Sequence, residues 1–330
     1  MAGLPKELIE NPPAGADVLS EVLRTVRLSA SLQFCVVGAG AWQTDDKPSL
    51  AKQAGGQANV VPFHIVAEGQ CWLEIEGRRH ALAEGDVVAF PFGTGHKIGA
   101  GSGGPVIHPT RDLPPKPWRT VPVLLYGEAS ERVRLLCGYL TCDAINFRPL
   151  RSALPSLLHL KTAAGGWLNA TVRQIVAEAD RPQTGSHSLI ERLTEILFIE
   201  VLRQEIAGAA SGSAGWLAAL ADPQLGRCLA LIHDEPKRDW SVPALSAAAG
   251  LSRTALTERF ETMLDTSPMR YVREWRLYLA GVALGTTSRG IAALAEEAGY
   301  GTEAAFNRAF SRAHGMPPSA WRQAARKRQG

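Results

Sequence analysis

Cysteine is scarce in this chain of 330 residues. The five thiols form an odd-numbered, scattered set: Cys35, Cys71, Cys137, Cys142 and Cys228. Secreted proteins that depend on disulfides carry denser sets in even numbers, so this composition excludes that class. We therefore expect free thiols.

Long apolar runs are missing as well. No stretch approaches the roughly 18 residues that a membrane helix needs. The opening segment MAGLPKELIENPPAG also lacks the basic stretch followed by an apolar one that export requires. These two absences predict a cytoplasmic protein with no membrane contact.

The chain as a whole has little excess of either charge, since its formal net charge is +3. The charge is unevenly distributed, however. Residues 223–330 carry 15 Lys and Arg against 10 Asp and Glu, a net charge of +5, whereas residues 1–222 carry 20 against 22, a net charge of −2. A basic last third favours a polyanionic partner, although a merely solvated basic face has the same composition.

The hydrophobic share of 45% provides for a sizeable core, and the length favours two or three domains. Residues 30–145 show short apolar alternations broken by Gly and Pro, which are typical of β-structure, whereas residues 186–330 show helical periodicity. We predict an α+β multidomain chain. Its parts are a β-domain over 1–150, a helical linker over 151–215 and an all-α domain over 216–330.

The segment QCWLEIEG shows the β-pattern most clearly. Cys71, Leu73 and Ile75 alternate with the residues between them, which places these three on one face of a strand. The pair Glu76-Gly77 then predicts a hairpin turn.

The linker contains a long helical pattern, SLIERLTEILFIEVLRQEIAG. Its apolar residues at helical spacing include Leu189, Leu193, Ile196, Leu197 and Val201. This stripe is wider than one face of the β-domain needs, so we predict that two copies of the helix form a two-fold homodimer. The alternative is packing onto the chain's own β-domain.

The last hundred residues contain a helix-turn-helix pattern. The segment DWSVPALSAAAGLSRTALTERF predicts a short helix over 242–249, a turn at Gly250 and a second helix from Arg253 to about Leu264, with Ser252 as its cap. Taken alone, this pattern fits a plain αα-hairpin equally well.

The same pattern then occurs a second time, with a first helix over 291–298, a turn at Gly299 and a second helix over 303–314. Between the two copies, SPMRYVREWRLYLAGVAL predicts a helix about 25 Å long. A spacer of this length suits two second helices about 34 Å apart, which is one turn of DNA. The repeat therefore predicts that one chain reads two successive major grooves.

The segment IAALAEEAGYGTEAAFNRAFSRAHGMPPSAWR carries an A-x-x-x-G-Y turn and a second helix with Phe306 and Phe310. It ends in G-x-x-P-x-x-x-R, supplied by Gly315, Pro318 and Arg322. On these motifs, residues 225–322 resemble the DNA-binding domain of the AraC/XylS family of transcription regulators. The resemblance implies a double helix-turn-helix domain that binds double-stranded DNA, with RNA polymerase as a partner.

Residues near the start of a recognition helix reach base edges in the major groove. The candidates are Arg253, Thr254, Thr257 and Glu258 in the first copy and Glu303, Asn307 and Arg308 in the second. Phosphate contacts are expected from Lys237, Arg270, Arg289, Arg312 and the tail RKRQG. Each charged residue has a solvated surface position as its alternative. The aromatic residues at helical spacing are expected in the core: Phe260, Tyr271, Trp275, Phe306, Phe310 and Trp321.

A second motif stands in the β-domain, in GDVVAFPFGTGHKIGA. Gly85, Pro91, Gly93 and His96 have the spacing G-x5-P-x-G-x2-H, on which residues 30–145 resemble a cupin barrel. Pro and Gly then make the turn between strands, and the histidine projects inward. The other cupin motif departs from its usual H-x-H with a following Glu, because NVVPFHIVAEGQCWLEIEG holds the single His64. This departure argues against oxygenase chemistry.

The inward-facing candidates for a metal site are His64, Cys71, His96 and Cys137. Two imidazoles and two thiolates suit a closed, tetrahedral zinc site. The alternatives are buried histidines with inert core thiols, or a thiol that responds to oxidants. The segments FHIVAEGQCWLEIEG and LLCGY are similar to those of AraC-type regulators with a cupin in the N-terminal half, some of which respond to oxidants. The remaining histidines, His80, His108, His159, His187, His233 and His314, are expected at the surface or at caps.

These observations predict a sequence-specific transcription regulator, not an enzyme, with a cupin domain that senses a small molecule, a metal or an oxidant. One alternative is a metal-dependent cupin oxygenase or isomerase with a helical appendage. Another is an architectural DNA-binding protein, which shows little sequence preference. The operator, the regulated genes, the effector and the sign of regulation stay open.

Overall fold

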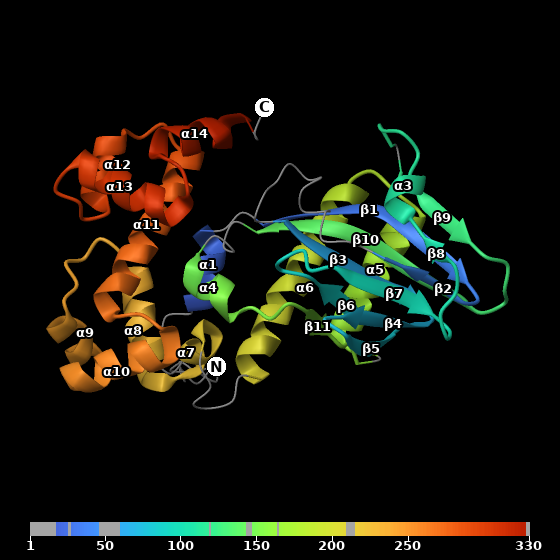
Figure 1. Ribbon diagram of the computed structural model, residues 1–330, viewed down its shortest axis with the longest axis horizontal. Coiled ribbons are helices and arrows are strands. Elements are labelled where there is room, and N and C mark those ends of the chain that lie inside the picture. Colours follow the sequence, from blue (N-terminus) through green and yellow to red (C-terminus); the bar gives the residue numbers. More distant parts are fainter. Residues whose placement is uncertain are drawn as a thin grey trace, which may run out of the picture. The chain divides into compact units, whose positions relative to one another are not determined.

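The computed structural model describes residues 18–25, 28–45, 60–118, 120–142, 147–163, 165–208 and 215–327. The chain forms two compact units (Figure 1). The β unit comprises residues 27–146 and 153–208, and the helical unit comprises residues 1–26, 147–152 and 209–330. The predicted domain boundaries at 150 and 215 stay a prediction. Within the described residues, no helix is both long enough and apolar enough to span a membrane.

The described strands of the β unit form two sheets. The six-stranded sheet has the order β11-β6-β3-β10-β1-β9, and the five-stranded sheet has the order β5-β4-β7-β2-β8. The strands are β1 (Leu28–Ala39), β2 (Trp42–Thr44), β3 (Val60–Glu68), β4 (Gln70–Ile75), β5 (Arg78–Ala83), β6 (Val87–Ala89), β7 (His96–Ala100), β8 (Val106–Ile107), β9 (Val123–Tyr126), β10 (Arg132–Cys142) and β11 (Leu158–Leu160). A short helix, α3 (Pro109–Asp112), lies between β8 and β9.

The two sheets of the β unit pack face to face, because one apolar core holds residues of both. Phe34, Val66 and Leu135 enter it from the six-stranded sheet, and Trp42 and Leu73 enter it from the five-stranded sheet. The β-rich, cupin-like fold predicted from the sequence is confirmed. The described strands form two sheets, however, where the sequence predicted a closed barrel.

The predicted alternation in β4 is present. Cys71, Leu73 and Ile75 all belong to the shared core. The hairpin turn between β4 and β5 is present too, with Glu76 at a φ of 50° and Gly77 at a φ of 74°. Both residues have left-handed backbone, which is the requirement of the two-residue hairpin turn that matches strand twist.

Two helices complete the β unit: α5 (Trp167–Asp180) and α6 (Ser186–Gly208). Helix α6 packs against α5 and against β1. The apolar residues of α6 divide between two faces, because Leu197 and Val201 are buried whereas Leu189 is 40% exposed and Ile196 is 42% exposed. One face of α6 therefore packs onto the β-domain, while another face leaves apolar residues exposed.

The helical unit contains the predicted repeat. Its helices are α1 (Val18–Thr25), α4 (Arg148–Ala153, which extends one residue past this unit), α7 (Trp216–Ala221), α8 (Pro223–Asp234), α9 (Val242–Ala249), α10 (Arg253–Leu264), α11 (Pro268–Thr286), α12 (Ile291–Glu297), α13 (Glu303–His314) and α14 (Pro318–Lys327). Helices α9 and α10 form the first helix-turn-helix motif, and α12 and α13 form the second. Figure 1 shows the two motifs near opposite ends of α11, whose 19 residues give it a length of about 28 Å.

The two motifs repeat each other in their caps. Ser252 caps α10 by accepting a hydrogen bond from the backbone N–H of Ala255, and Thr302 caps α13 by accepting one from Ala305. Each second helix ends at a residue with left-handed backbone, Asp265 in the first motif and Gly315 in the second. These local signals fix where both second helices begin and end.

Aromatic side chains fill the core of the helical unit. Phe260, Tyr271, Trp275, Phe306 and Phe310 are at most 1% exposed, which confirms their predicted burial.

Phe147, which follows β10 in the sequence, belongs to this aromatic core. Its ring contacts those of Trp216, His233 and Trp275. Helix α1 also packs here, against α8. Two segments from the first half of the sequence therefore complete the helical unit.

The expectation of a surface or capping position for His233 was wrong. This side chain is only 4% exposed. Its Nε2 atom lies 2.8 Å from the hydroxyl of Tyr271, which also accepts a hydrogen bond of 2.7 Å from the indole of Trp216. His233 is also stacked on Trp275. The imidazole therefore serves as a core residue, which its isolated position in the sequence did not indicate.

Candidate nucleic-acid interface and buried imidazole cluster

The first recognition helix, α10, presents a polar surface at its start. Arg253, Thr254 and Glu258 are exposed, whereas Leu256 on the opposite side is fully buried. Thr257 is only partly exposed, and its hydroxyl donates to the carbonyl of Arg253 one turn earlier. Of the four predicted base-reading residues here, three therefore extend into solvent and one is engaged by its own helix.

The second recognition helix, α13, has the same arrangement. Glu303, Arg308 and Arg312 are exposed, whereas Phe306 is buried. Asn307 is partly buried, and its Oδ1 atom is buried without a hydrogen-bond partner within the described structure. Arg308 is thus the residue of α13 whose position best suits base recognition, since its guanidinium pairs naturally with guanine in the major groove.

Several cations of the helical unit are held by carboxylates of the same unit. Arg259 bonds to both carboxylate oxygens of Asp222, at 2.9 and 2.8 Å. Arg270 lies 3.1 Å from a carboxylate oxygen of Glu274 on the same helix. These pairs reduce the positive charge that is available to a phosphate.

Two further predicted phosphate contacts, Lys237 and Arg289, share one carboxylate. Lys237 Nζ lies 3.2 Å from Oε2 of Glu297, and Arg289 forms an ion pair with Oε1 of the same residue. In the predicted basic tail, the last three residues lie outside the described part of the chain. Contacts of all these residues with DNA stay a prediction.

The β unit brings together three of the four residues predicted to bind a metal. His64 Nδ1 lies 3.1 Å from the sulfur of Cys137, which is its register partner on the neighbouring strand β10. His64 Nε2 lies 3.0 Å from Nε2 of His96, the first residue of β7. We call His64, His96 and Cys137 the imidazole–thiol cluster.

The surroundings of the imidazole–thiol cluster are apolar and closed. Both imidazoles are less than 9% exposed. His96 stacks on Phe90 with ring centroids 3.8 Å apart, and its Nδ1 atom lies 3.0 Å from the carbonyl oxygen of Thr94. Burial, followed by the nearby His96, lowers the pKa of His64 from 6.5 to about 3, so this imidazole is neutral at neutral pH. The roles of Phe90 and Thr94 had no signal in the sequence, since they depend on the turn that precedes β7.

The geometry of the imidazole–thiol cluster fits a zinc ion only in part. Two nitrogens that bind one tetrahedral zinc at 2.0–2.1 Å stand about 3.3 Å apart, which is close to the 3.0 Å between the two Nε2 atoms. Cys137, however, contacts the other nitrogen of His64. Across the described residues, no group of three or more His, Cys, Asp or Glu side chains is placed to hold a metal ion.

Cys71, the fourth predicted ligand, lies in the shared core of the two sheets, as Cys137 does. Burial, together with the charge of Asp86, raises the pKa of Cys71 to about 12, which keeps it a thiol in this environment. A thiolate is the form that binds zinc, so this sulfur becomes a ligand only if the ion displaces its proton. Zinc at this place stays a prediction.

Family comparisons agree with the two units. A family model described as "Cupin" matches residues 17–207, more than half of the chain, and a model described as "Helix-turn-helix domain" matches residues 245–324. A protein from Streptomyces lividans named "Putative AraC-like transcription regulator" is 29% identical over 318 residues, which cover 93% of this chain and 98% of the relative.

Two solved structures are similar to the chain. The DNA-binding domain of AdpA, in complex with a target DNA, is 26% identical, with coverage of 32% of this chain and 96% of that one and a TM-score of 0.30. ToxT from Vibrio cholerae is 10% identical, with coverage of 90% of this chain and 97% of that one and a TM-score of 0.36.

Proposed function

The chain belongs to the AraC/XylS family of DNA-binding transcription regulators, in the group with an N-terminal cupin domain, and on this premise we propose how it reads DNA. One chain uses α10 and α13 to read two successive major grooves of one operator. The observation that carries this proposal is the repeat itself. Both second helices begin at a capped turn, bury one aromatic or aliphatic face and expose a polar one.

Base recognition is assigned to Arg253, Thr254 and Glu258 of α10 and to Glu303 and Arg308 of α13. These side chains are exposed near the starts of the two helices, where a helix in the major groove meets base edges. Thr257 and Asn307, which are only partly exposed, stay in the set of residues proposed to contact bases. Arg312 contacts phosphates together with the other cations predicted for this role, Lys237, Arg270, Arg289 and the basic tail, so binding weakens as salt concentration rises.

Arg308 provides the test of this assignment. The operator is first selected from a random DNA pool, and Arg308→Ala is then measured on that operator and on single-base variants by fluorescence anisotropy at fixed salt. We expect a loss of about 1–3 kcal/mol and relaxed preference at one operator position. Arg273→Ala, which removes an exposed arginine from α11, is the control. An equal loss on every DNA sequence contradicts base reading and assigns Arg308 to a phosphate.

We further propose that the imidazole–thiol cluster is where the cupin domain receives its signal. Zinc, bound by His64, Cys71, His96 and Cys137, is the metal that nitrogen and sulfur donors favour, and a small molecule or an oxidant is the other class of effector. Metal analysis of the chain after purification without chelators tests the zinc set. About one equivalent of zinc per chain supports it, whereas a content far below one leaves the cluster as a set of core residues.

We also propose where the chain acts, which partners it has and how it assembles, because a transcription regulator must reach its promoter. The chain acts in the cytoplasm, where it reaches DNA and contacts RNA polymerase. It acts by binding and not by catalysis, and it forms a homodimer through α6, whose exposed Leu189 and Ile196 stand seven residues apart on one helical face.

A further inference from the structure

Arg276, on the central helix α11, contacts both helix-turn-helix motifs. Its Nε atom donates a hydrogen bond of 2.7 Å to the carbonyl of Pro236, and its Nη2 atom donates one of 2.7 Å to the carbonyl of Arg238. Both carbonyls belong to the loop that leads into α9, the first helix of the first motif. The guanidinium therefore holds this loop through two separate nitrogens.

The third nitrogen of Arg276 lies against the second motif. A Cβ atom placed on Gly299, the turn residue after α12, would stand 2.7 Å from Arg276 Nη1. Gly299 also has a φ of 83°, which disfavours any side chain. Glycine at this turn thus serves both the backbone conformation and the close approach of the guanidinium.

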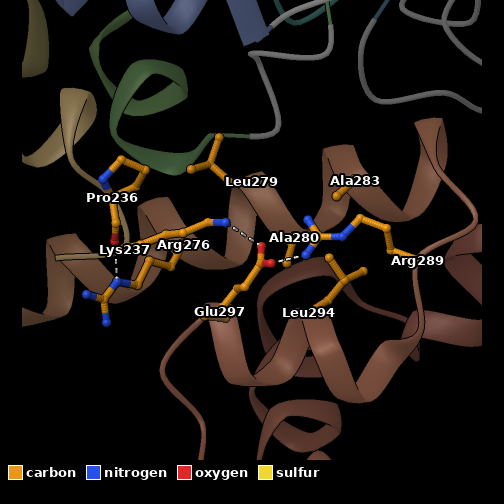
Figure 2. Close-up of a pocket in the computed structure, with 10 residues that line it drawn as sticks. Pro236, Lys237, Arg276, Leu279, Ala280, Ala283, Arg289, Leu294 and Glu297 are labelled. Atoms are coloured by element: carbon orange, nitrogen blue, oxygen red, sulfur yellow. Dashed lines mark hydrogen bonds and ion pairs between the residues drawn. The ribbon is translucent and has the colours of Figure 1, made fainter. Parts of the chain in front are cut away.

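An ion pair makes a second connection between the motifs. Lys237, in the same loop before α9, lies 3.2 Å from the carboxylate of Glu297 at the end of α12. Arg289, just before α12, pairs with the other oxygen of that carboxylate. We call Lys237, Arg276, Arg289 and Glu297 the inter-motif bridge. Figure 2 shows Lys237 and Arg289 converging on Glu297, while the guanidinium of Arg276 points toward Pro236.

The inter-motif bridge lines a pocket between the two motifs. A pocket of about 170 Å³ lies between the loop before α9, α11 and α12, with Leu279, Ala280 and Ala283 from α11 in its lining (Figure 2). Apolar packing between the motifs is therefore incomplete at this place. The polar contacts of the bridge supply the direct connection here.

We propose that Arg276 is a positioning residue that sets the angle between the two helix-turn-helix motifs, and through it the spacing of the two operator half-sites. This inference rests on the proposed reading of two grooves by one chain. Two recognition helices reach adjacent grooves only at one relative orientation, and α11 alone connects the motifs through the backbone. Arg276 joins a loop of one motif to the turn of the other, so it fixes the orientation that the backbone leaves adjustable.

The test measures binding of the full chain to DNA probes in which the half-sites of the selected operator are moved by one or two base pairs. A probe that keeps one half-site is measured beside them, at fixed salt, by fluorescence anisotropy. For Arg276→Met we expect about tenfold weaker binding at the best spacing, since two hydrogen bonds to a charged group are lost. We also expect a flatter dependence on spacing and unchanged binding to the single half-site.

Two variants accompany it. Arg276→Lys keeps the positive charge, but its single amine cannot take the place of all three nitrogens of the guanidinium. Its spacing dependence is therefore expected to lie between those of the wild type and Arg276→Met. Arg273→Met is the matched control, because this exposed arginine of α11 donates a hydrogen bond to the carbonyl of Met269 on its own helix. Its spacing dependence is expected to equal that of the wild type.

Other outcomes overturn the inference. An unchanged spacing dependence in Arg276→Met shows that this residue does not position the motifs, and an equal loss on the single half-site shows a role in folding only. If Arg276→Met does not fold by circular dichroism, Glu297→Gln removes the second connection and leaves Arg276 in place. An unchanged spacing dependence in that variant contradicts the bridge. If the wild type binds one half-site as tightly as two, the reading of two grooves itself is wrong.

Discussion

At the scale of single residues, the buried imidazoles predict that the stability of the protein depends on pH. Burial lowers the pKa of His233 from 6.5 to about 3. At pH 5 the folded chain therefore leaves this residue neutral, whereas the unfolded chain protonates it. Protons bind preferentially to the unfolded state, so the free energy of unfolding is fully retained above pH 6.5 and decreases as the pH falls from 6.5 towards 3.

We predict that His233→Gln reduces this pH dependence. The 1.5 pH units between 6.5 and 5 correspond to about 2 kcal/mol for one such histidine, and the variant no longer titrates. Urea unfolding of the full chain, followed by circular dichroism at pH 7.5 and pH 5, measures the effect. His187→Gln, at an exposed position of the β unit, is the control. An undiminished pH dependence in His233→Gln would show that His233 is protonated in the folded chain.

A second residue-scale lesson concerns contacts that lie far apart in the sequence. Arg134 on β10 donates to the sulfur of Cys35 on β1, at 3.2 Å, and forms an ion pair with Asp180 at the end of α5. The neighbours of Arg134 in β10, Val133 and Leu135, both belong to the shared core. The sequence of β10 does not indicate which residues Arg134 contacts, because its partners come from a different strand and a helix.

At the scale of elements, the two recognition helices depend on their caps. Ser252 and Thr302 each accept a hydrogen bond from a backbone N–H in the first turn, at 3.1 and 3.2 Å. The proposed base-reading residues Arg253 and Glu303 follow these caps directly. Loss of a cap therefore weakens the turn that carries the reading side chains, as well as the helix.

We predict that Ser252→Ala and Thr302→Ala each lower the free energy of unfolding by about 1 kcal/mol. Each variant should also weaken binding to the selected operator, because the first turn of its recognition helix frays. Chemical unfolding and fluorescence anisotropy measure the two effects. Ser288→Ala, an exposed serine of the loop before α12, is the control. Stability equal to that of the wild type in both cap variants would argue that the caps do not hold these helices.

For helix α6, the sequence predicted the helix correctly but did not predict which of its apolar residues are buried. The periodicity predicted its helix, and the structure has it over Ser186–Gly208. The predicted single apolar face is divided, since Leu197 and Val201 pack inward whereas Leu189 and Ile196 are exposed. Periodicity gives the positions of apolar residues around a helix, but only the packing of the β unit decides which of them are covered.

At the scale of the whole molecule, the exposed residues of α6 bear on assembly. Leu189 and Ile196 are exposed on one face of α6, and the same helix carries the ion pairs Arg192–Glu195 and Arg203–Glu200. Exposed apolar residues seven positions apart have the spacing that pairs of helices use in two-fold interfaces. The dimer proposed for this regulator follows from this surface.

We predict that the wild type sediments as a dimer at micromolar concentration and that Ile196→Glu sediments as a monomer, because a buried, unpaired carboxylate opposes the interface. Ala177→Glu places the same charge on an exposed position of α5 and is expected to remain dimeric. A monomeric wild type would remove the dimer from the proposal.

The sequence by itself determined the two helix-turn-helix motifs almost to the residue, because their signals are local. Caps at Ser252 and Thr302, turn glycines and helical periodicity act within a few positions of each other. The same holds for the β4–β5 hairpin, whose alternation and turn residues are neighbours in the chain. The cupin motif likewise predicted the inward direction of His96.

Only the tertiary structure decided which distant residues meet. It paired His64 with Cys137 and His96, while the geometry around them does not assemble the full ligand set predicted from the sequence. It brought Phe147 and α1 into the helical unit, buried His233, and placed Arg276 between the two motifs. Local sequence patterns do not encode such contacts, because each depends on the packing of elements separated by tens of residues, where no spacing rule applies.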